Sequence, residues 1–151
     1  MARYAIYCRL YDQVPSEWMA QLADEGCTYS VEENGGLAEK FTFEWPDQKL
    51  VIHVMPRSEI SLHLDGFVGY VHWLCGNQGI EPDMDLIGRI RQTQLVLGCV
   101  LTPDVVDDGD ETESPAEKVM SAIIHHTKSL LFYGDAIYDE RLNLILRPSE
   151  D

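Results

Sequence analysis

The chain of 151 residues is long enough to bury a hydrophobic core, and its length predicts a single domain spanning residues 1–151. It carries 26 acidic side chains against 11 Lys and Arg, which gives a formal net charge of −15 at pH 7. Because so negative a surface repels phosphate groups, we expect neither nucleic acid nor an anionic membrane as a partner. A protein partner, basic segments included, and a small molecule both stay open.

The N-terminus and the cysteines indicate the compartment. Arg9 interrupts the first apolar stretch, so residues 1–9 lack the pattern of a secretory signal, and no apolar run reaches transmembrane length. The cysteines are widely spaced and form no C-x-x-C pair: Cys8, Cys27, Cys75 and Cys99. We therefore expect a cytoplasmic protein with reduced thiols.

The first third of the chain is rich in strand signals. Four strand-like runs lie at residues 4–10, 27–32, 40–45 and 50–54, most of them with apolar–polar alternation. A short helix is expected after Pro15, where apolar residues recur at helical spacing as far as Ala23. The sequence Asn34-Gly35-Gly36 predicts a tight hairpin turn, because a type I′ turn needs positive φ at its two central positions.

The centre of the chain is predicted to be helical. A stripe of apolar residues recurs at helical spacing: Leu64, Phe67, Val68, Val71, Leu74 and Cys75. Gly76 is expected to end this helix, and a shorter helix is expected from residue 83 or 84 to about residue 93.

The last third repeats the order of the first. A strand at residues 95–101 leads to residues 104–113, where six acids in ten residues predict a solvated loop. It is not a calcium loop, because Val106 and Pro115 occupy ligand positions. Ser114 and Glu117 form a capping box before the next helix. Strands at residues 129–133 and 142–146 follow, with a brief apolar segment between turns at 136–138.

These elements predict an α+β fold: a mostly antiparallel sheet with helices packed on one face. Two strand–helix–strand–strand halves, approximately residues 1–56 and 94–148, suggest a pseudo-duplication. The helical connection at residues 57–93 joins them. The acidic loop at residues 104–113 has no counterpart in the first half.

A candidate site lies on the central helix, on the side away from its apolar stripe. Asp65, Gly69 and His72 share that side, with Gly66 and Trp73 beside them. Each interior glycine costs a helix about 1 kcal/mol relative to alanine. With two glycines in one turn, we expect a stabilising contact at this position that offsets the cost. Another element of the fold, a second subunit or a ligand stacked on Trp73 would each supply one. We predict a ligand or partner site at Asp65, Gly69, His72 and Trp73.

Catalytic, metal and cofactor signatures are not found in the sequence. It has no G-x-S-x-G, no G-x-x-x-x-G-K-[ST], no G-x-G-x-x-G and no H-E-x-x-H. His72 and Cys75 are spaced like two metal ligands, but Cys75 belongs to the apolar stripe. We therefore predict no catalytic residues, no metal site and no cofactor.

Three functional hypotheses follow. The leading one is a non-catalytic cytoplasmic binding domain that recognises a protein partner or a small molecule through a sheet face or the central helix. Its acidic loop would attract a basic partner through Asp107, Asp108, Asp110 and Glu111. The alternatives are a small enzyme that uses His72 and Asp65 in a cleft, and a structural protein that self-associates as a homo-oligomer.

Overall fold

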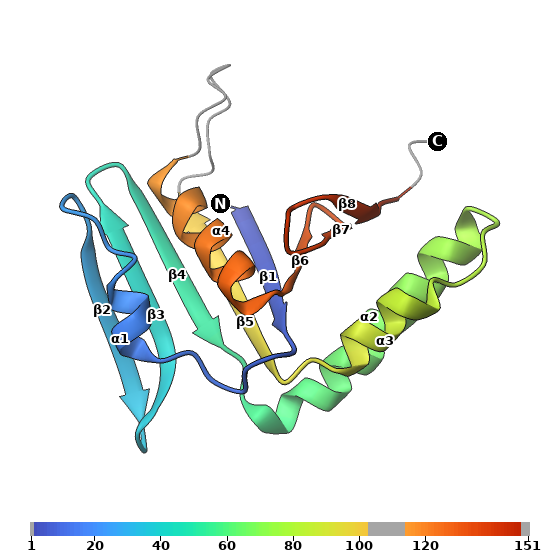
Figure 1. The fold of residues 1–151 in the computed structure, drawn as a ribbon, viewed down its shortest axis with the longest axis horizontal. Helices are drawn as coiled ribbons and strands as arrows, with labels where there is room; N and C mark the ends of the chain where they lie inside the picture. Colours follow the sequence, from blue (N-terminus) through green and yellow to red (C-terminus); the bar gives the residue numbers. More distant parts are fainter. Residues whose placement is uncertain (1, 103–113, 149–151) are drawn as a thin grey trace.

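The computed structural model describes residues 2–102 and 114–148 of the chain, and over these ranges the residues form one sheet and four helices (Figure 1). The strands are β1 (Ala2–Cys8), β2 (Thr28–Asn34), β3 (Leu37–Trp45), β4 (Gln48–Val54), β5 (Leu95–Thr102), β6 (Leu130–Tyr133), β7 (Ala136–Tyr138) and β8 (Leu144–Leu146). The helices are α1 (Ser16–Ala20), α2 (Arg57–Asn77), α3 (Met84–Arg91) and α4 (Pro115–Thr127).

The eight strands form a single sheet in the order β2-β3-β4-β5-β1-β6-β7-β8. Every described pairing between neighbours is antiparallel. The prediction of an α+β fold with a mostly antiparallel sheet is therefore confirmed. The N-terminal strand β1 lies inside the sheet, where it pairs with β5 on one side and β6 on the other.

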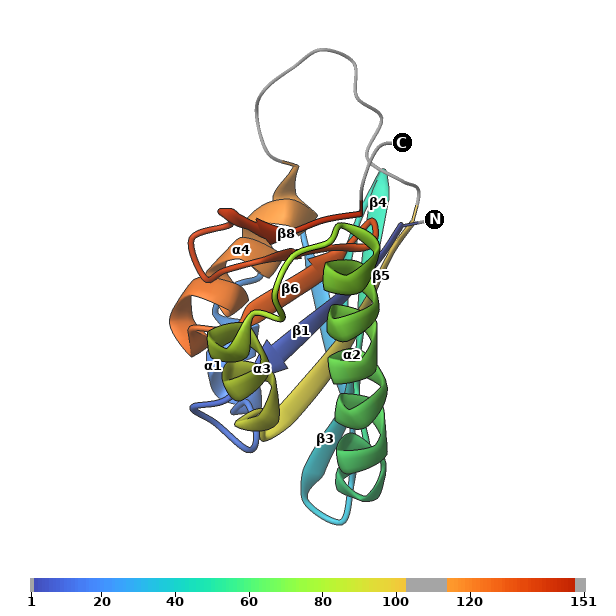
Figure 2. The ribbon, with the colours of Figure 1, turned by 90° about the vertical axis from the view of Figure 1, so that its right-hand side faces the viewer.

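The helices cover both faces of the sheet, so the expectation that they pack on one face is wrong. Helices α1 and α4 pack on one face of the sheet and α2 packs on the other, as Figure 2 shows. Helix α3 contributes Leu86, Ile87 and Ile90 to the core beneath α2. The reason lies in the central strands, which are apolar on both sides. In β1, Ile6 belongs to the core under α4 and its neighbour Tyr7 to the core under α2. Two apolar faces require two covering layers.

The two halves share an element order but not a connectivity. Each half has one strand, one helix and then three strands. This is one strand more than the strand–helix–strand–strand pattern, because residues 50–54 form β4 in the first half and residues 136–138 pair as β7 in the second. In the first half the last strand of the three, β4, adjoins the sheet centre. In the second half the first strand, β6, does so. The pseudo-duplication itself stays a prediction.

Two local features predicted from the sequence, a hairpin turn and a helix cap, are present in the structure. Gly35 and Gly36 have φ of 63° and 85° in the turn between β2 and β3, as the turn signal predicts. The capping box is confirmed: the Glu117 amide donates to Ser114 Oγ, and the Ser114 amide donates to Glu117 Oε1. None of the helices in the described ranges is both long and apolar enough to cross a membrane.

Candidate functional site

The residues predicted on the central helix all lie on the outer side of α2, exposed to solvent. Asp65 forms an ion pair with Arg91 of α3. The ring of Trp73 is stacked on Tyr70, with the two ring centroids 6.0 Å apart. Neither of the two cavities described below includes Asp65, Gly69, His72 or Trp73. These two cavities therefore give no support to the hypothesis of an enzyme with a His72/Asp65 cleft.

The two helix glycines are not explained by packing within the described chain. A Cβ atom added at Gly66 or at Gly69 would meet no heavy atom within 4 Å. Among the described residues, therefore, no element of the fold packs against these glycines, and the explanation by internal packing gains no support there. A second subunit and a ligand stay open. The four acidic loop residues of the prediction, Asp107, Asp108, Asp110 and Glu111, lie outside the described residues.

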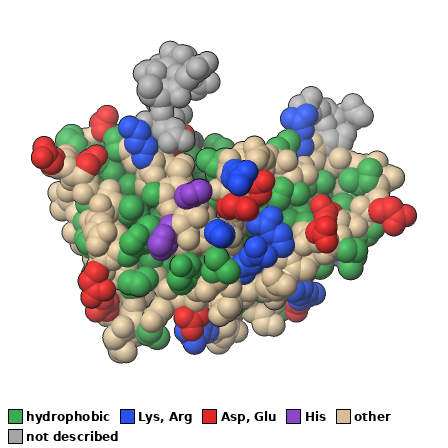
Figure 3. Space-filling model, in the orientation of Figure 1, with side chains coloured by type: hydrophobic (Ala, Val, Ile, Leu, Met, Phe, Trp, Pro, Cys, Tyr) green, Lys and Arg blue, Asp and Glu red, His purple; other side chains and the backbone are tan. Residues whose placement is uncertain are grey.

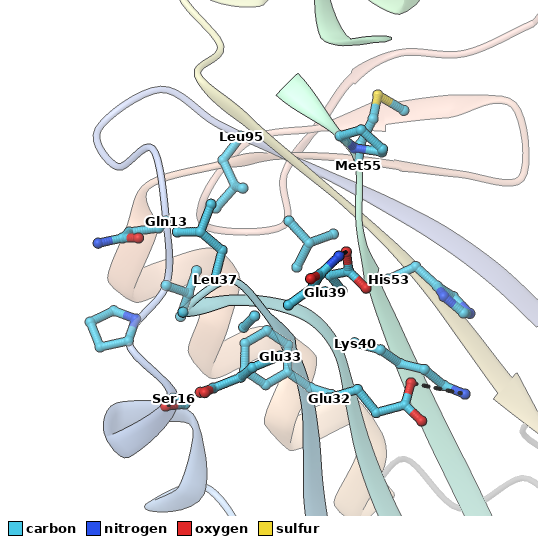
Figure 4. A pocket seen from close by; sticks show the side chains of 18 of the residues that line it. Gln13, Ser16, Glu32, Glu33, Leu37, Glu39, Lys40, His53, Met55 and Leu95 are labelled. Atoms are coloured by element: carbon cyan, nitrogen blue, oxygen red, sulfur yellow. Dashed lines mark hydrogen bonds and ion pairs between the residues drawn. The ribbon is translucent and has the colours of Figure 1, made fainter. Parts of the chain in front are cut away.

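A larger feature, which the sequence did not indicate, is a cavity of about 880 Å³ at one end of the sheet. Figure 4 shows it between the loop that enters α1, the β2–β3 hairpin and the junction of β4 with α2. Its apolar lining includes Val14, Phe41 and Leu95, all of which are buried. Leu37 adds an exposed apolar side chain.

The rim of this cavity is acidic. Five carboxylates line it against three basic side chains: Asp12, Glu17, Glu32, Glu33 and Glu39 against Lys40, His53 and Arg57. Two of the carboxylates are paired, Asp12 with Arg57 at 2.9 Å and Glu32 with Lys40 at 3.9 Å. Within the described ranges, the other three have no ion-pair partner. The rim therefore carries unneutralised negative charge.

The hairpin geometry explains where the two unpaired β2 and β3 carboxylates lie. The register of β2 on β3 shifts between Glu32 and Glu33, which leaves Glu39 as an extra residue on β3. Glu33 accepts a hydrogen bond from Ser16 Oγ at 3.4 Å, and Glu39 accepts one from Asn34 Nδ2 at 3.2 Å. These neutral donors hold the carboxylates at the rim without cancelling their charge.

A second cavity, of about 450 Å³, adjoins the first. The ion-paired side chains of Asp12 and Arg57 line both. Thr93 and Arg91 contribute to the second cavity, with Ile60 and Leu64 from α2 as its apolar part. The Asp12–Arg57 ion pair thus forms a shared wall, open to solvent, between the two.

Among the described residues, the buried thiol of Cys8 lies in a polar pocket of the core. Burial raises the pKa of the Cys8 thiol, although hydrogen bonds with Ser129 and Thr127 act in the opposite direction. The Ser129 hydroxyl donates to Cys8 Sγ at 3.0 Å in a fully buried position. A buried thiol with a raised pKa is a poor nucleophile, because the thiolate is the reactive form.

The histidines are dispersed over the described surface. His63 hydrogen-bonds the Tyr7 hydroxyl at 2.8 Å, and His126 is stacked on Trp18 with ring centroids 4.2 Å apart. In the part of the chain that the structure describes, no three His, Cys, Asp or Glu side chains are grouped as metal ligands would be.

The acidic side chains on the α4 face are spread over several places rather than gathered in one patch (Figure 3). The cavity rim therefore stands out by its position above an apolar floor, not by charge alone. Sequence reasoning missed it because its walls come from three segments distant in the chain. The one available signal was the concentration of charge beside the Asn34-Gly35-Gly36 turn.

No family model matches this sequence, and the comparisons with curated proteins and with solved structures also gave no match.

Proposed function

We propose that this protein is a non-catalytic cytoplasmic binding domain that recognises a basic, partly apolar segment of a protein partner in the larger cavity. One observation carries the proposal: an apolar floor lies beneath a rim with five carboxylates and three basic groups. Its volume of about 880 Å³ is within the range of about 300–1,000 Å³ that ligand sites commonly have.

The chemistry of the rim and floor suits an arginine or lysine side chain. Such a side chain buries its aliphatic stem on apolar surface and keeps its cationic end in a polar environment. Leu37, the exposed apolar side chain of the lining, would contact the stem, and Glu33 and Glu39 would accept hydrogen bonds from the cation. An arginine can bind a carboxylate with two parallel hydrogen bonds, which adds directional selectivity.

The overall charge supports the same choice of partner. A net charge of −15 attracts a basic segment over distances longer than direct contacts, and this attraction mainly raises the association rate. The acidic rim would then hold the segment at close range. A small cationic molecule would meet the same groups and is the alternative to a protein segment.

The test is a titration with a fluorescent peptide in which Arg alternates with Leu, compared with a peptide in which Glu replaces Arg. The double variant Glu33→Gln with Glu39→Gln should bind the basic peptide about tenfold more weakly, since two partly exposed ion pairs at about 0.7 kcal/mol each are removed. The control is Glu25→Gln with Glu44→Gln, an equal change of charge at exposed positions outside the cavity.

The outcomes separate the candidates. Equal weakening in both double variants would mean that net charge, not the cavity, attracts the peptide. Failure of the wild-type protein to bind the basic peptide more tightly than the acidic one would refute the proposal. Competition by N-acetyl-arginine amide at concentrations comparable with the peptide would favour a small cationic molecule as the ligand.

A further inference from the structure

Helix α2 presents an exposed apolar stripe to solvent. The stripe consists of Leu62, Gly66, Gly69 and Trp73, spaced four, three and four residues apart, which places all four within about 40° of one line along the helix. Leu62 is 79% exposed and Trp73 is 58% exposed. In Figure 2 no described element is drawn in front of α2.

The two glycines make a hollow between the two large side chains. Nothing in the described chain lies within 4 Å of a Cβ added at either glycine. An interior glycine costs a helix about 1 kcal/mol relative to alanine, and a contact that offsets this cost would have to come from outside the described residues. A hollow of this shape admits the backbone of another helix.

We propose that the stripe is the contact between two copies of this chain, with the two α2 helices packed antiparallel about a twofold axis between residues 67 and 68. The spacing of the stripe is the same read in either direction. The axis therefore places Leu62 against Trp73 of the second copy, and Gly66 against Gly69 of the second copy. Each large side chain of one copy is covered by a large side chain of the other, as a self-complementary twofold contact requires.

The flanking polar side chains, a carboxylate and an imidazole, are also complementary in this arrangement. Asp65 and His72 lie about 60° and 80° to the same side of the stripe, at about 100° per residue. An antiparallel twofold pairing brings Asp65 of one copy, which also pairs with Arg91 of its own chain, to the same side of the contact as His72 of the other, twice. A parallel twofold pairing would instead place the two Asp65 side chains on opposite sides of the contact, so that Asp65 would not meet His72. The antiparallel arrangement also aligns the two helix dipoles favourably.

The size and the net charge determine the strength of the contact. One helix pair buries less than the roughly 1,200–2,000 Å² of a stable interface, so we expect a reversible dimer that depends on protein concentration. Two copies that each carry a net charge of −15 repel each other, and salt screens this repulsion. Added salt should therefore strengthen the dimer. The stripe shares no residue with the cavity of the proposed function.

The first experiment is sedimentation equilibrium over a concentration series. The wild-type mass should rise from 17.2 kDa toward that of two chains. Gly69→Leu should weaken the dimer about tenfold or more, because the added side chain occupies the hollow. This variant should still fold, since leucine favours helix and the site is open in the single chain. Lys118→Leu adds the same side chain to exposed α4 and should leave the dimer unchanged.

The second experiment tests the register with cysteine variants in a Cys27→Ser background. Oxidation of a mixture of Leu62→Cys and Trp73→Cys proteins should give a disulfide-linked dimer, whereas each variant alone should not. A wild-type protein that stays monomeric at every concentration and salt level would overturn the proposal. So would a Gly69→Leu protein that associates as tightly as wild type, or a cross-link formed equally well by Leu62→Cys alone.

Discussion

Replacing Gly66 and Gly69 together by alanine should stabilise the folded chain. Both residues lie in the interior of the 21-residue helix α2, and neither has the positive φ that favours glycine. An added Cβ meets nothing within 4 Å at either position, so no steric cost offsets the gain. Each substitution should contribute about 1 kcal/mol, chiefly because alanine loses less backbone entropy on folding than glycine.

The sum of about 2 kcal/mol corresponds to a rise of about 4–8 °C in Tm, since 1 kcal/mol shifts Tm by about 2–4 °C for a chain of 150–250 residues. Far-UV circular dichroism during heating and during urea titration measures it. The protein concentration should be low enough for the single chain to dominate, because a dimer through the same glycines would stabilise the wild type by mass action.

Gly79→Ala is the matched control for the double variant. An added Cβ there is also free of neighbours, but the backbone φ is +67°, which alanine adopts only with strain. The same chemical change should therefore destabilise the chain by about 1 kcal/mol. If the double variant were no more stable than wild type while Gly79→Ala behaved as expected, the inference that the α2 glycines lie against open space would be refuted.

Two further predictions concern the cap of α4 and the buried thiols. Ser114→Ala removes the capping box and should lower the free energy of unfolding by about 1 kcal/mol, measured from the urea midpoint; an unchanged midpoint would mean that α4 does not need its cap. Burial raises the pKa of Cys99 from 9.0 to about 12. Because the folded chain favours the neutral thiol, its contribution to stability is present below pH 9.0 and is lost as the pH rises toward about 12. Urea titrations between these pH values should show this loss in the wild type and a shallower one in Cys99→Ala.

The features that the sequence predicted correctly are local ones. The Asn34-Gly35-Gly36 turn follows from backbone geometry at neighbouring residues, and the buried side of α2 follows from a spacing within a single helix. The cap at Ser114 joins residues three apart. Each of these signals is complete within a few residues, so no knowledge of the rest of the chain is needed to interpret it.

The features that the sequence did not predict depend on pairing between distant segments. The position of β1 between β5 and β6 joins Ile6 to Leu97 on one side and to Leu131 on the other. Alternation in β1 indicated one apolar face, but Tyr7 on the opposite face is also buried, beneath α2. From the sequence alone, an aromatic side chain such as Tyr7 could equally be exposed to solvent or buried. Its burial depends on α2, which packs against that face of the sheet.

The cavity could not be predicted from the sequence for the same reason, because its lining comes from segments that are distant in the chain. Asp12 and Arg57 are 45 residues apart, and only the fold brings them to a common wall. The outer side of α2 is the opposite case, because its residues belong to one helix and their shared side was predictable. The sequence did not show that the space above Gly66 and Gly69 is free of other described residues, which argues against internal packing within that part of the chain.

The two proposals require opposite responses to salt, and this allows one series of measurements to separate them. Attraction of a basic segment to the acidic rim weakens as counterions screen it, whereas association of two copies that each carry −15 strengthens. If peptide binding used the α2 stripe instead of the cavity, it would compete with self-association, and the Gly69→Leu protein would lose both. Peptide binding that survives in Gly69→Leu, and a dimer that survives in the Glu33→Gln with Glu39→Gln protein, would establish two independent surfaces on this chain.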